Sequence, residues 1–268
     1  MANHHHHDDH SLAEILDLDG EVLHSYLSDV TAWVRDLTAD RPPHRLLDLG
    51  SGTGTGTFAL LERFGDAEAI ALDQSEPMLR HLEGRARERG LAGRVRTLQA
   101  DLDKGWPPVG EVDLVWASAS LHHLADPGRV LAEAHAALRP GGLLIAAETA
   151  GFPRFLPQEH AGLEERCHAI LDRRRAEALP HFGDDWGPRL ASAGFTVEAE
   201  RVFDVRLTHP LPASAGRYAE RSLRRMRHGL DGTLDAASLA ALDAVLDGIG
   251  ERDDLEVRTT RTVWAARR

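Results

Sequence analysis

Hydrophobic and polar positions follow two alternating patterns over residues 45–148. Short apolar runs that end beside a glycine or an aspartate predict buried strands, and apolar residues at spacings of three and four predict helices with one buried face. The predicted strands are 45–50, 69–73, 94–100, 112–118 and 143–148, and the predicted helices are 58–64, 75–89 and 127–138. Because strand and helix alternate five times, we expect a parallel sheet with helices on both faces.

The chain on either side of this region is more helical. Apolar residues over 11–39 predict one or two amphipathic helices with a break at Gly20. After residue 150 the pattern predicts helices at 157–178 and 213–249 and strands at 196–203 and 255–266. We therefore expect an N-terminal helical cap at 11–40 and an α/β domain at 41–268. That domain would carry helical insertions at about 151–188 and 212–250.

Charge and cysteine content narrow the functional classes. The net charge of −12 argues against nucleic acid and anionic membrane surfaces as partners, because both attract a positive field. The basic run 221–227 is interpreted as a solvated helix face. Cys167 is the only cysteine, which excludes a disulfide within the chain and fits a reducing compartment. With neither a membrane-length apolar run nor a signal-peptide core, we expect a soluble cytoplasmic protein.

The first ten residues, MANHHHHDDH, are set apart by composition. We expect an expression tag or a disordered tail here, and a metal-binding tract is the alternative. Elsewhere no Cys/His spacing indicates a zinc site, so we expect no metal in the fold.

The glycine-rich stretch SGTGTGT, residues 51–57, joins the first strand to a helix and could bind a nucleotide. A phosphate-binding P-loop is excluded because Gly56 is followed by Thr57 instead of lysine. The dinucleotide-binding fingerprint is matched only by Gly54, Gly56 and Ala59, which lie well past the end of the predicted strand. An NAD(P)- or flavin-dependent oxidoreductase is therefore kept as an alternative. Asp48 lies two residues before Gly50, and this acidic position suits a ligand ammonium better than a pyrophosphate.

The segment DLGSGTG, residues 48–54, resembles the first motif of class I S-adenosylmethionine-dependent methyltransferases. The resemblance extends over about residues 45–148 and is to the branch of ubiquinone/menaquinone-biosynthesis and other small-molecule enzymes. It implies a three-layer Rossmann-like α/β fold whose seven-strand mixed sheet has the order 3-2-1-4-5-7-6, with the last strand antiparallel. It also implies S-adenosylmethionine as cofactor, S-adenosylhomocysteine as product and a small-molecule methyl acceptor.

The same resemblance implies which residues hold the cofactor. Its methionine half would lie on the loop, its ribose on Asp73 and its adenine beside the end of the third strand. The residues so assigned are Tyr26, Asp48, Gly50, Ser51, Gly52, Asp73, Gln74, Met78, Asp101, Leu102 and Ser118. Tyr26 is the aromatic residue that would close the site from the N-terminal helices.

Methyl transfer is an in-line displacement, so the enzyme mainly positions the nucleophile, and a base is needed only when the acceptor must lose a proton. His122 and His123 follow the fourth strand and are the candidate catalytic residues, with His123 favoured and Glu148 a weaker candidate. Pocket-lining or packing roles for both histidines stay open. Oxygen or carbon is the favoured acceptor atom. The fourth strand lacks the Asn/Asp-Pro-Pro-aromatic signature that marks many enzymes acting on amide or nucleobase nitrogen.

The acceptor pocket is expected to form from the N-terminal helix and the two late insertions. Its aromatic candidates, besides Tyr26, are Trp33, Phe152, Phe155, His181, Phe182 and Trp186. A non-catalytic S-adenosylmethionine-binding module remains an alternative to an enzyme. Homodimer formation is left open by the sequence.

Overall fold

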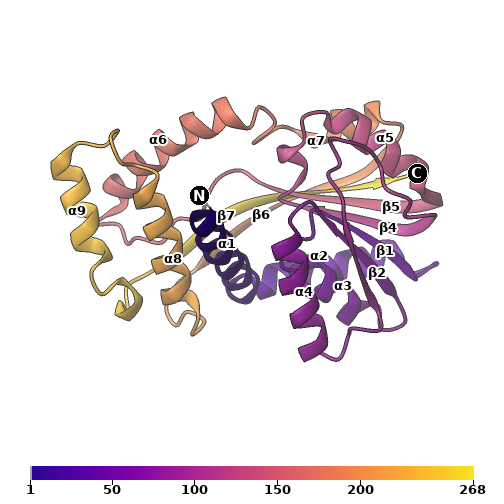
Figure 1. Ribbon diagram of the computed structural model, residues 1–268, viewed down its shortest axis with the longest axis horizontal. Coiled ribbons are helices and arrows are strands. Elements are labelled where there is room, and N and C mark those ends of the chain that lie inside the picture. The colour runs from indigo at the N-terminus through magenta and orange to yellow at the C-terminus, as the bar shows by residue number, and fades with distance from the viewer. Residues whose placement is uncertain (1) are drawn as a thin grey trace.

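The computed structural model describes the backbone of residues 2–268 and the side chains of residues 11–268. One seven-stranded sheet runs through the molecule in the order β3-β2-β1-β4-β5-β7-β6 (Figure 1). The strands are β1 (Arg45–Leu49), β2 (Glu68–Asp73), β3 (Val95–Gln99), β4 (Val112–Ser118), β5 (Leu138–Thr149), β6 (Thr196–Leu207) and β7 (Val257–Arg267). β7 pairs antiparallel with both β5 and β6, and the other neighbours are parallel. The predicted strand order and the antiparallel last strand are confirmed.

Helices cover both faces of this sheet, which explains why most residues of its central strands are apolar. The helices are α1 (Ala2–Val22), α2 (His24–Leu37), α3 (Thr55–Arg63), α4 (Glu76–Glu88), α5 (Pro127–Ala137), α6 (Ala161–Ala178), α7 (Trp186–Ser192), α8 (Ala215–His228) and α9 (Ala236–Leu246). Leu46, Leu114 and Ile145 point into one buried cluster, and their neighbours Leu47 and Val115 point into the other. The alternation places one helical layer over each cluster.

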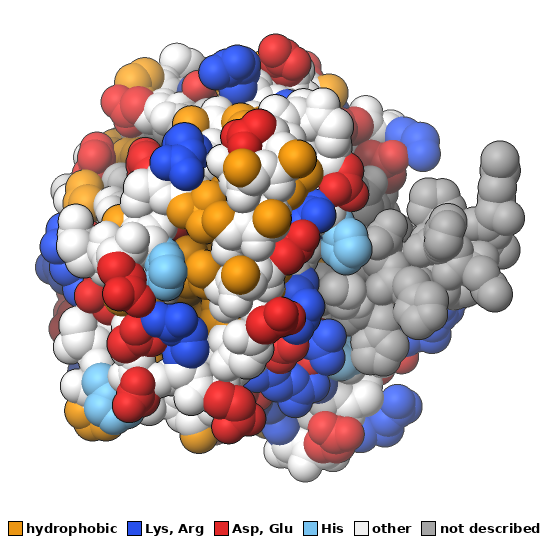
Figure 2. Space-filling model, turned by 90° about the vertical axis from the view of Figure 1, so that its left-hand side faces the viewer, with side chains coloured by type: hydrophobic (Ala, Val, Ile, Leu, Met, Phe, Trp, Pro, Cys, Tyr) orange, Lys and Arg blue, Asp and Glu red, His pale blue; other side chains and the backbone are white. Residues whose placement is uncertain are grey.

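The insertions form a helical cap at one end of the sheet. α6, α8 and α9 lie beyond the ends of the central strands, and the long strands β6 and β7 reach toward them (Figure 1). At this end small apolar side chains lie among charged ones (Figure 2), and α9 contributes the exposed alanines 236, 237, 240, 241 and 244. Arg221, Arg224 and Arg225 of α8 are exposed, as predicted for the basic run. No helix among the described residues has both the length and the apolar composition needed to cross a bilayer.

Four predicted boundaries were wrong. The first helix does not break at Gly20 but continues to Val22, and Leu23 separates it from α2. Gly20 instead allows a close approach, because a Cβ atom there would lie 2.4 Å from Cγ2 of Thr55. α3 begins at Thr55, three residues before the predicted start, directly after Gly54 in the left-handed conformation.

β5 begins at Leu138, five residues before the predicted start at 143, although Arg-Pro-Gly-Gly lacks a strand pattern. The extra length is held by pairing of Leu138 with Val112 across a bulge, and by an ion pair between the half-buried Asp113 and the buried Arg139. α6 begins at Ala161 instead of about 157. The expectation of a tag or tail at residues 1–10 falls on side chains outside the described residues and stays a prediction.

Candidate functional site

The glycine loop is fastened to the neighbouring strand β2. The N–H groups of Gly50 and Ser51 both donate to the carbonyl oxygen of Leu72, at 2.9 Å. The N–H of Gly52 donates to Oδ2 of Asp73 at 2.8 Å, and Oδ1 of Asp73 accepts from the N–H of Ser75 at 2.8 Å. Asp73 therefore fixes the loop and the start of α4. Each oxygen still has a free lone pair for a ligand hydroxyl.

The loop is also pressed against the segment that follows β4. Gly50 has a φ of +70°, and a Cβ atom there would lie 2.5 Å from Cβ of Ser120. Ser120 donates its hydroxyl to the carbonyl of Leu49 at 2.7 Å. Only glycine meets both the conformation and the close approach without strain. The ends of β1 and β4 are thereby held together at one edge of the sheet.

Ser51 carries a polar group that suits a ligand. Its side chain is buried, and its Oγ has no hydrogen-bond partner among the described residues. Buried polar atoms are nearly always partnered, so an orphan on a glycine-rich loop indicates a missing partner from outside the chain. An aminoacyl group supplies both donors and acceptors to such a hydroxyl.

Asp48 lies beneath the loop. Its carboxyl is buried and accepts a hydrogen bond from Oγ1 of Thr57 at 2.6 Å, so it joins β1 to the first turn of α3. Burial raises the pKa of Asp48 to about 7, more than the Thr57 hydrogen bond lowers it, and the charge of Asp73 adds to the rise. A cationic ligand group nearby would favour the ionised form.

The third predicted carboxylate, Asp101, follows β3. It is partly exposed, lies 2.9 Å from Nζ of Lys104 and accepts from the N–H of Asp103 at 3.0 Å. The hydrogen bond from Lys104 lowers the pKa of Asp101. Since β3, β2 and β1 are adjacent parallel strands, Asp101, Asp73 and Asp48 lie at the same edge of the sheet.

The remaining predicted cofactor residues differ in exposure. Met78 is buried in α4, whose N-cap Ser75 accepts from the Met78 N–H at 3.4 Å, and Leu102 is buried after Asp101. Gln74 is exposed. Ser118 ends β4 half-buried and pairs in register with Ala147 of β5.

Among the predicted cofactor residues, Tyr26 contacts the strand at the far edge of the sheet from β3, namely β6. Its buried ring packs edge-on against Phe203 of β6, with centroids 5.2 Å apart, and the guanidinium carbon of Arg261 lies 6.0 Å from its centre. Burial raises the pKa of Tyr26 to about 12. The charge of Arg261 lowers the pKa of Tyr26, and the carboxylates of Asp19 and Glu148 raise it. The sheet residues that act on Tyr26 therefore belong to β5, β7 and β6.

His122 has a carboxylate partner that the sequence interpretation did not assign. Its Nδ1 lies 2.6 Å from Oε2 of Glu148, and both side chains are buried. Oε1 of Glu148 accepts from the N–H groups of Ser120 at 3.1 Å and Leu121 at 2.9 Å. The sequence interpretation kept Glu148 only as a weaker catalytic candidate. The adjacency of β4 and β5 was the available signal for this contact, since it brings the two strand ends together.

His123 differs from His122 in its surroundings. Its ring is exposed and lies 4.2 Å from the His122 ring, centre to centre. Desolvation by nearby protein atoms and the charge of His122 lower the pKa of His123. The ring of Phe182, from the segment before α7, packs edge-on against His122 at 5.0 Å. His122 is therefore fixed on two sides, whereas His123 is open to solvent.

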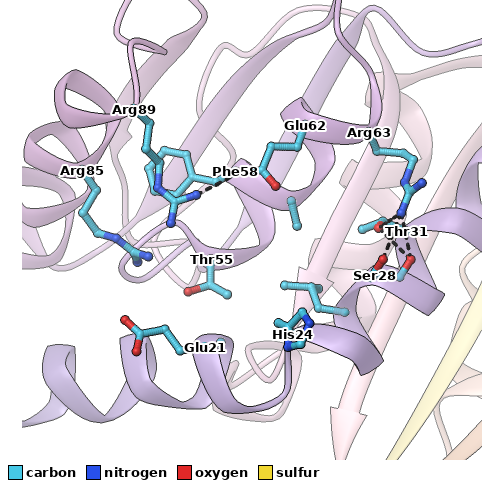
Figure 3. Close-up of a pocket in the computed structure, with 13 residues that line it drawn as sticks. Glu21, His24, Ser28, Thr31, Thr55, Phe58, Glu62, Arg63, Arg85 and Arg89 are labelled. Atoms are coloured by element: carbon cyan, nitrogen blue, oxygen red, sulfur yellow. Dashed lines mark hydrogen bonds and ion pairs between the residues drawn. The ribbon is translucent and has the colours of Figure 1, made fainter. Parts of the chain in front are cut away.

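A cavity of about 550 Å³ lies elsewhere, between the N-terminal helices and α3 and α4 (Figure 3). Glu21 and His24 line one wall, and Thr55 and Phe58 belong to the opposite one. None of the predicted cofactor residues lines this cavity. Its three arginines are engaged: Arg63 with Ser28, Arg85 with Asp17, and Arg89 with Glu62. The cavity is therefore separate from the strand-end site.

Comparisons with known proteins identify the family and the fold. Residues 46–142 match the family model described as a methyltransferase domain. The chain is 42% identical over 221 residues to a trans-aconitate 2-methyltransferase of Acidovorax ebreus, covering 78% of this chain and 77% of that protein. It is 35% identical over 176 residues to a malonyl-[acyl-carrier protein] O-methyltransferase of Laribacter hongkongensis, covering 62% of this chain. The chain spans 56% of that protein's length, and 62% and 50% of two further relatives.

A solved structure shares the fold. The Bacillus subtilis protein YcgJ superposes with a TM-score of 0.56 at 17% identity, over 89% of this chain and 97% of the other.

Proposed function

Because this chain belongs to the class I S-adenosylmethionine-dependent methyltransferases, we propose that it transfers a methyl group to an oxygen nucleophile of a small-molecule acceptor. The reaction takes place at the carboxyl edge of β1, β2 and β4. The cofactor supplies an electrophilic methyl group on a sulfonium, which is already a good leaving group. The enzyme's task is therefore to hold the acceptor oxygen in line and to accept its proton.

The glycine loop holds the methionine half of the cofactor. The unpartnered hydroxyl of Ser51 and the loop from Gly50 to Gly52 bind the aminoacyl group, and Asp48 beneath them balances its ammonium. Asp73 accepts the ribose hydroxyls on its remaining lone pairs, and Asp101 accepts from the adenine amino group. Leu102, Gln74, Met78 and Ser118 line the nucleoside, and Tyr26 closes the site on the acceptor side.

His122 accepts the acceptor's proton. The observation that carries this assignment is the 2.6 Å contact between Nδ1 of His122 and Glu148, made by two buried side chains. A carboxylate at that distance holds the proton on Nδ1, and the lone pair on Nε2 is left to act as base. Phe182 fixes the ring plane. His123, exposed beside it, lines the entrance.

Equilibrium binding and turnover test this function separately. We expect S-adenosylhomocysteine to bind in isothermal titration calorimetry and NAD(H) not to bind, which opposes the oxidoreductase alternative. Mass spectrometry then detects methylated products from a panel of small hydroxy compounds and acids. Trans-aconitate belongs in the panel because a relative is named for it. Binding without any methylated product would favour a non-catalytic module.

His122→Gln and His123→Gln form a matched pair for the base. We expect the first to lower kcat by about 10²- to 10⁴-fold, the usual range for a general base, and the second by less than about tenfold. Both should keep their affinity for S-adenosylhomocysteine. A larger loss in His123→Gln would assign the base to His123 instead.

The compartment and the oligomeric state are part of the same proposal. A cytoplasmic enzyme is supported by the buried free thiol of Cys167, the one cysteine of the chain. A homodimer stays a prediction that light scattering of the purified protein tests.

A further inference from the structure

His168 is a buried histidine whose ring makes no hydrogen bond. It lies on α6 and is 2% exposed, and neither Nδ1 nor Nε2 has a partner among the described residues. Leaving a buried polar group unpaired costs free energy, and nearly all such groups in folded proteins have partners. The imidazole therefore has unused hydrogen-bonding capacity in the cap, outside the strand-end site.

The charges that act on this imidazole are positive. Burial, together with the guanidinium groups of Arg154 and Arg175, lowers the pKa of His168 to about 3. Asp172 lies 3.0 Å from Arg175 and the exposed Glu165 lies 3.7 Å from Arg154, and the buried carboxylate of Glu164 also acts on Arg154. Since no carboxylate is among the charges that shift the His168 pKa, its surroundings favour an anion.

Glu164 is the remaining carboxylate on this stretch of α6, and it is otherwise engaged. It is buried and accepts from the N–H groups of Phe155 at 2.7 Å and Leu156 at 3.3 Å. It also lies 3.5 Å from the guanidinium of Arg258. It fixes the strand-to-helix connection and does not neutralise Arg175.

Aromatic rings connect this region to His122. The guanidinium carbon of Arg175 lies 3.6 Å from the ring centre of Phe152 and 4.5 Å from that of Phe182. Phe182 in turn contacts His122. Arg175 is thus held between two rings, one of which packs on the proposed base. Only the ring of Phe182 therefore lies between Arg175 and the proposed base His122.

Arg175 and His168 are both buried, and this cluster reaches the surface at Phe152. Phe152 is 51% exposed, and its ring lies 6.5 Å from the ring of His168. An anion that entered beside Phe152 would meet Arg175 first and the buried imidazole next. Arg175 offers further N–H donors besides the one that Asp172 uses.

We propose that Arg154, Arg175 and His168 form a subsite that binds an oxyanion of the methyl acceptor, a carboxylate or a phosphate. This rests on the proposed function and deepens it: the acceptor presents its nucleophilic oxygen to His122 and its anionic group to the cap. Charge-assisted bonds from the arginines bind the oxyanion, and the imidazole donates one N–H to it. The substrate is therefore an acid.

Binding of small anions to the enzyme saturated with S-adenosylhomocysteine tests the subsite. The probes are malonate and inorganic phosphate, measured by titration calorimetry on the full chain. We expect Arg175→Gln to weaken binding of the preferred anion by at least about tenfold, as loss of a charged donor does. Arg173→Gln, exposed on the same helix, should bind it as the wild type does. Stronger binding of malonate identifies a carboxylate acceptor, and stronger binding of phosphate a phosphorylated one.

A second measurement, made on the wild-type protein, does not depend on whether Arg175→Gln folds. Anion binding should raise the pKa of His168, followed by NMR of its ring, because a bound oxyanion favours the charged imidazole. His168→Gln keeps an N–H donor and should retain part of the affinity. If S-adenosylhomocysteine binds but neither anion does, and the His168 resonance does not respond, the subsite is wrong. If S-adenosylhomocysteine itself fails to bind, the proposed function fails first.

Discussion

Nδ1 of His122 and Oε2 of Glu148 lie 2.6 Å apart, and the other oxygen of Glu148 accepts two backbone N–H groups from the same turn. One carboxylate thus sets both the path of residues 120–121 and the orientation of the imidazole. This dual use means that the backbone contacts and the histidine contact can be separated by substitution.

Glu148→Gln makes that separation. The Gln carbonyl oxygen can still accept from Ser120 and Leu121, while its NH₂ group faces His122. Nδ1 must then accept, the proton moves to Nε2, and the ring can no longer act as base. We expect kcat to fall by about 10²- to 10⁴-fold with little change in the affinity for S-adenosylhomocysteine. An unchanged kcat would mean that Glu148 only shapes the turn.

Asp48 predicts a pH dependence of stability. Its pKa is about 7 in the folded protein, so the folded state keeps a proton that the unfolded state releases near pH 4. Its contribution to stability therefore falls as pH rises from about 4 to about 7 and is constant above that. Because one pKa unit corresponds to about 1.36 kcal/mol, the loss is on the order of 4 kcal/mol at most.

Asp48→Asn removes this titration and can still accept from Thr57. We expect the free energy of unfolding of the variant, relative to wild type, to increase between about pH 4 and about pH 7 in urea titrations without cofactor, and to stay constant above that. Asp66→Asn, at an exposed site after α3, is the control and should show no such trend. A pH-independent difference for Asp48→Asn would contradict the raised pKa.

The central sheet was predictable because its strands are buried on both faces. Residues 69–72 are all apolar, and a short apolar run that follows a glycine loop and a helix has few interpretations other than a strand. The carboxylates Asp48, Asp73 and Asp101 were predictable for the same reason, since the ends of parallel strands share one edge.

What escaped prediction depends on contacts between distant segments. The partner of Glu148 is 26 residues away, on the neighbouring strand's loop, and no local pattern marks it. A glycine such as Gly20 is typical of a helix break, but here it lies inside α1 and leaves room for the side chain of Thr55. The start of β5 is fixed by pairing with Val112, which overrides the turn chemistry of Arg-Pro-Gly-Gly.

Gly50→Ala should be more damaging than the same change at a comparable glycine. Gly90 has a similar positive φ, +68°, but no atom lies within 4 Å of a Cβ placed there. Gly90→Ala should cost about 1–2 kcal/mol for the left-handed conformation alone. Gly50→Ala adds the clash with Ser120, which brings about 1–3 kcal/mol more and displaces the loop. Urea unfolding measures the difference, and equal losses at both positions would argue against the close approach.

Asp19 fastens α1 over the site. Its carboxylate accepts from the hydroxyl of Tyr218 on α8 at 2.5 Å and from the guanidinium of Arg261 on β7 at 2.8 Å. On the same helix Leu16 approaches the loop, since its Cδ1 lies 3.4 Å from where a Gly52 Cβ would be. Asp19→Asn weakens the contact with a largely buried Arg261, which costs about 1.5–3 kcal/mol when a charged hydrogen bond is lost.

We expect the Asp19→Asn substitution to speed amide hydrogen exchange in α1 and to weaken S-adenosylhomocysteine binding by about tenfold or more. Glu14→Gln is the matched control, because Glu14 lies on the same helix and its ion pairs with described side chains are those with the exposed Arg217 and Arg221. Loss of such a surface pair should cost less than about 1 kcal/mol and leave binding unchanged. Faster exchange in α1 with unaltered cofactor affinity would separate α1 from the cofactor site and assign Asp19 to the stability of the cap alone.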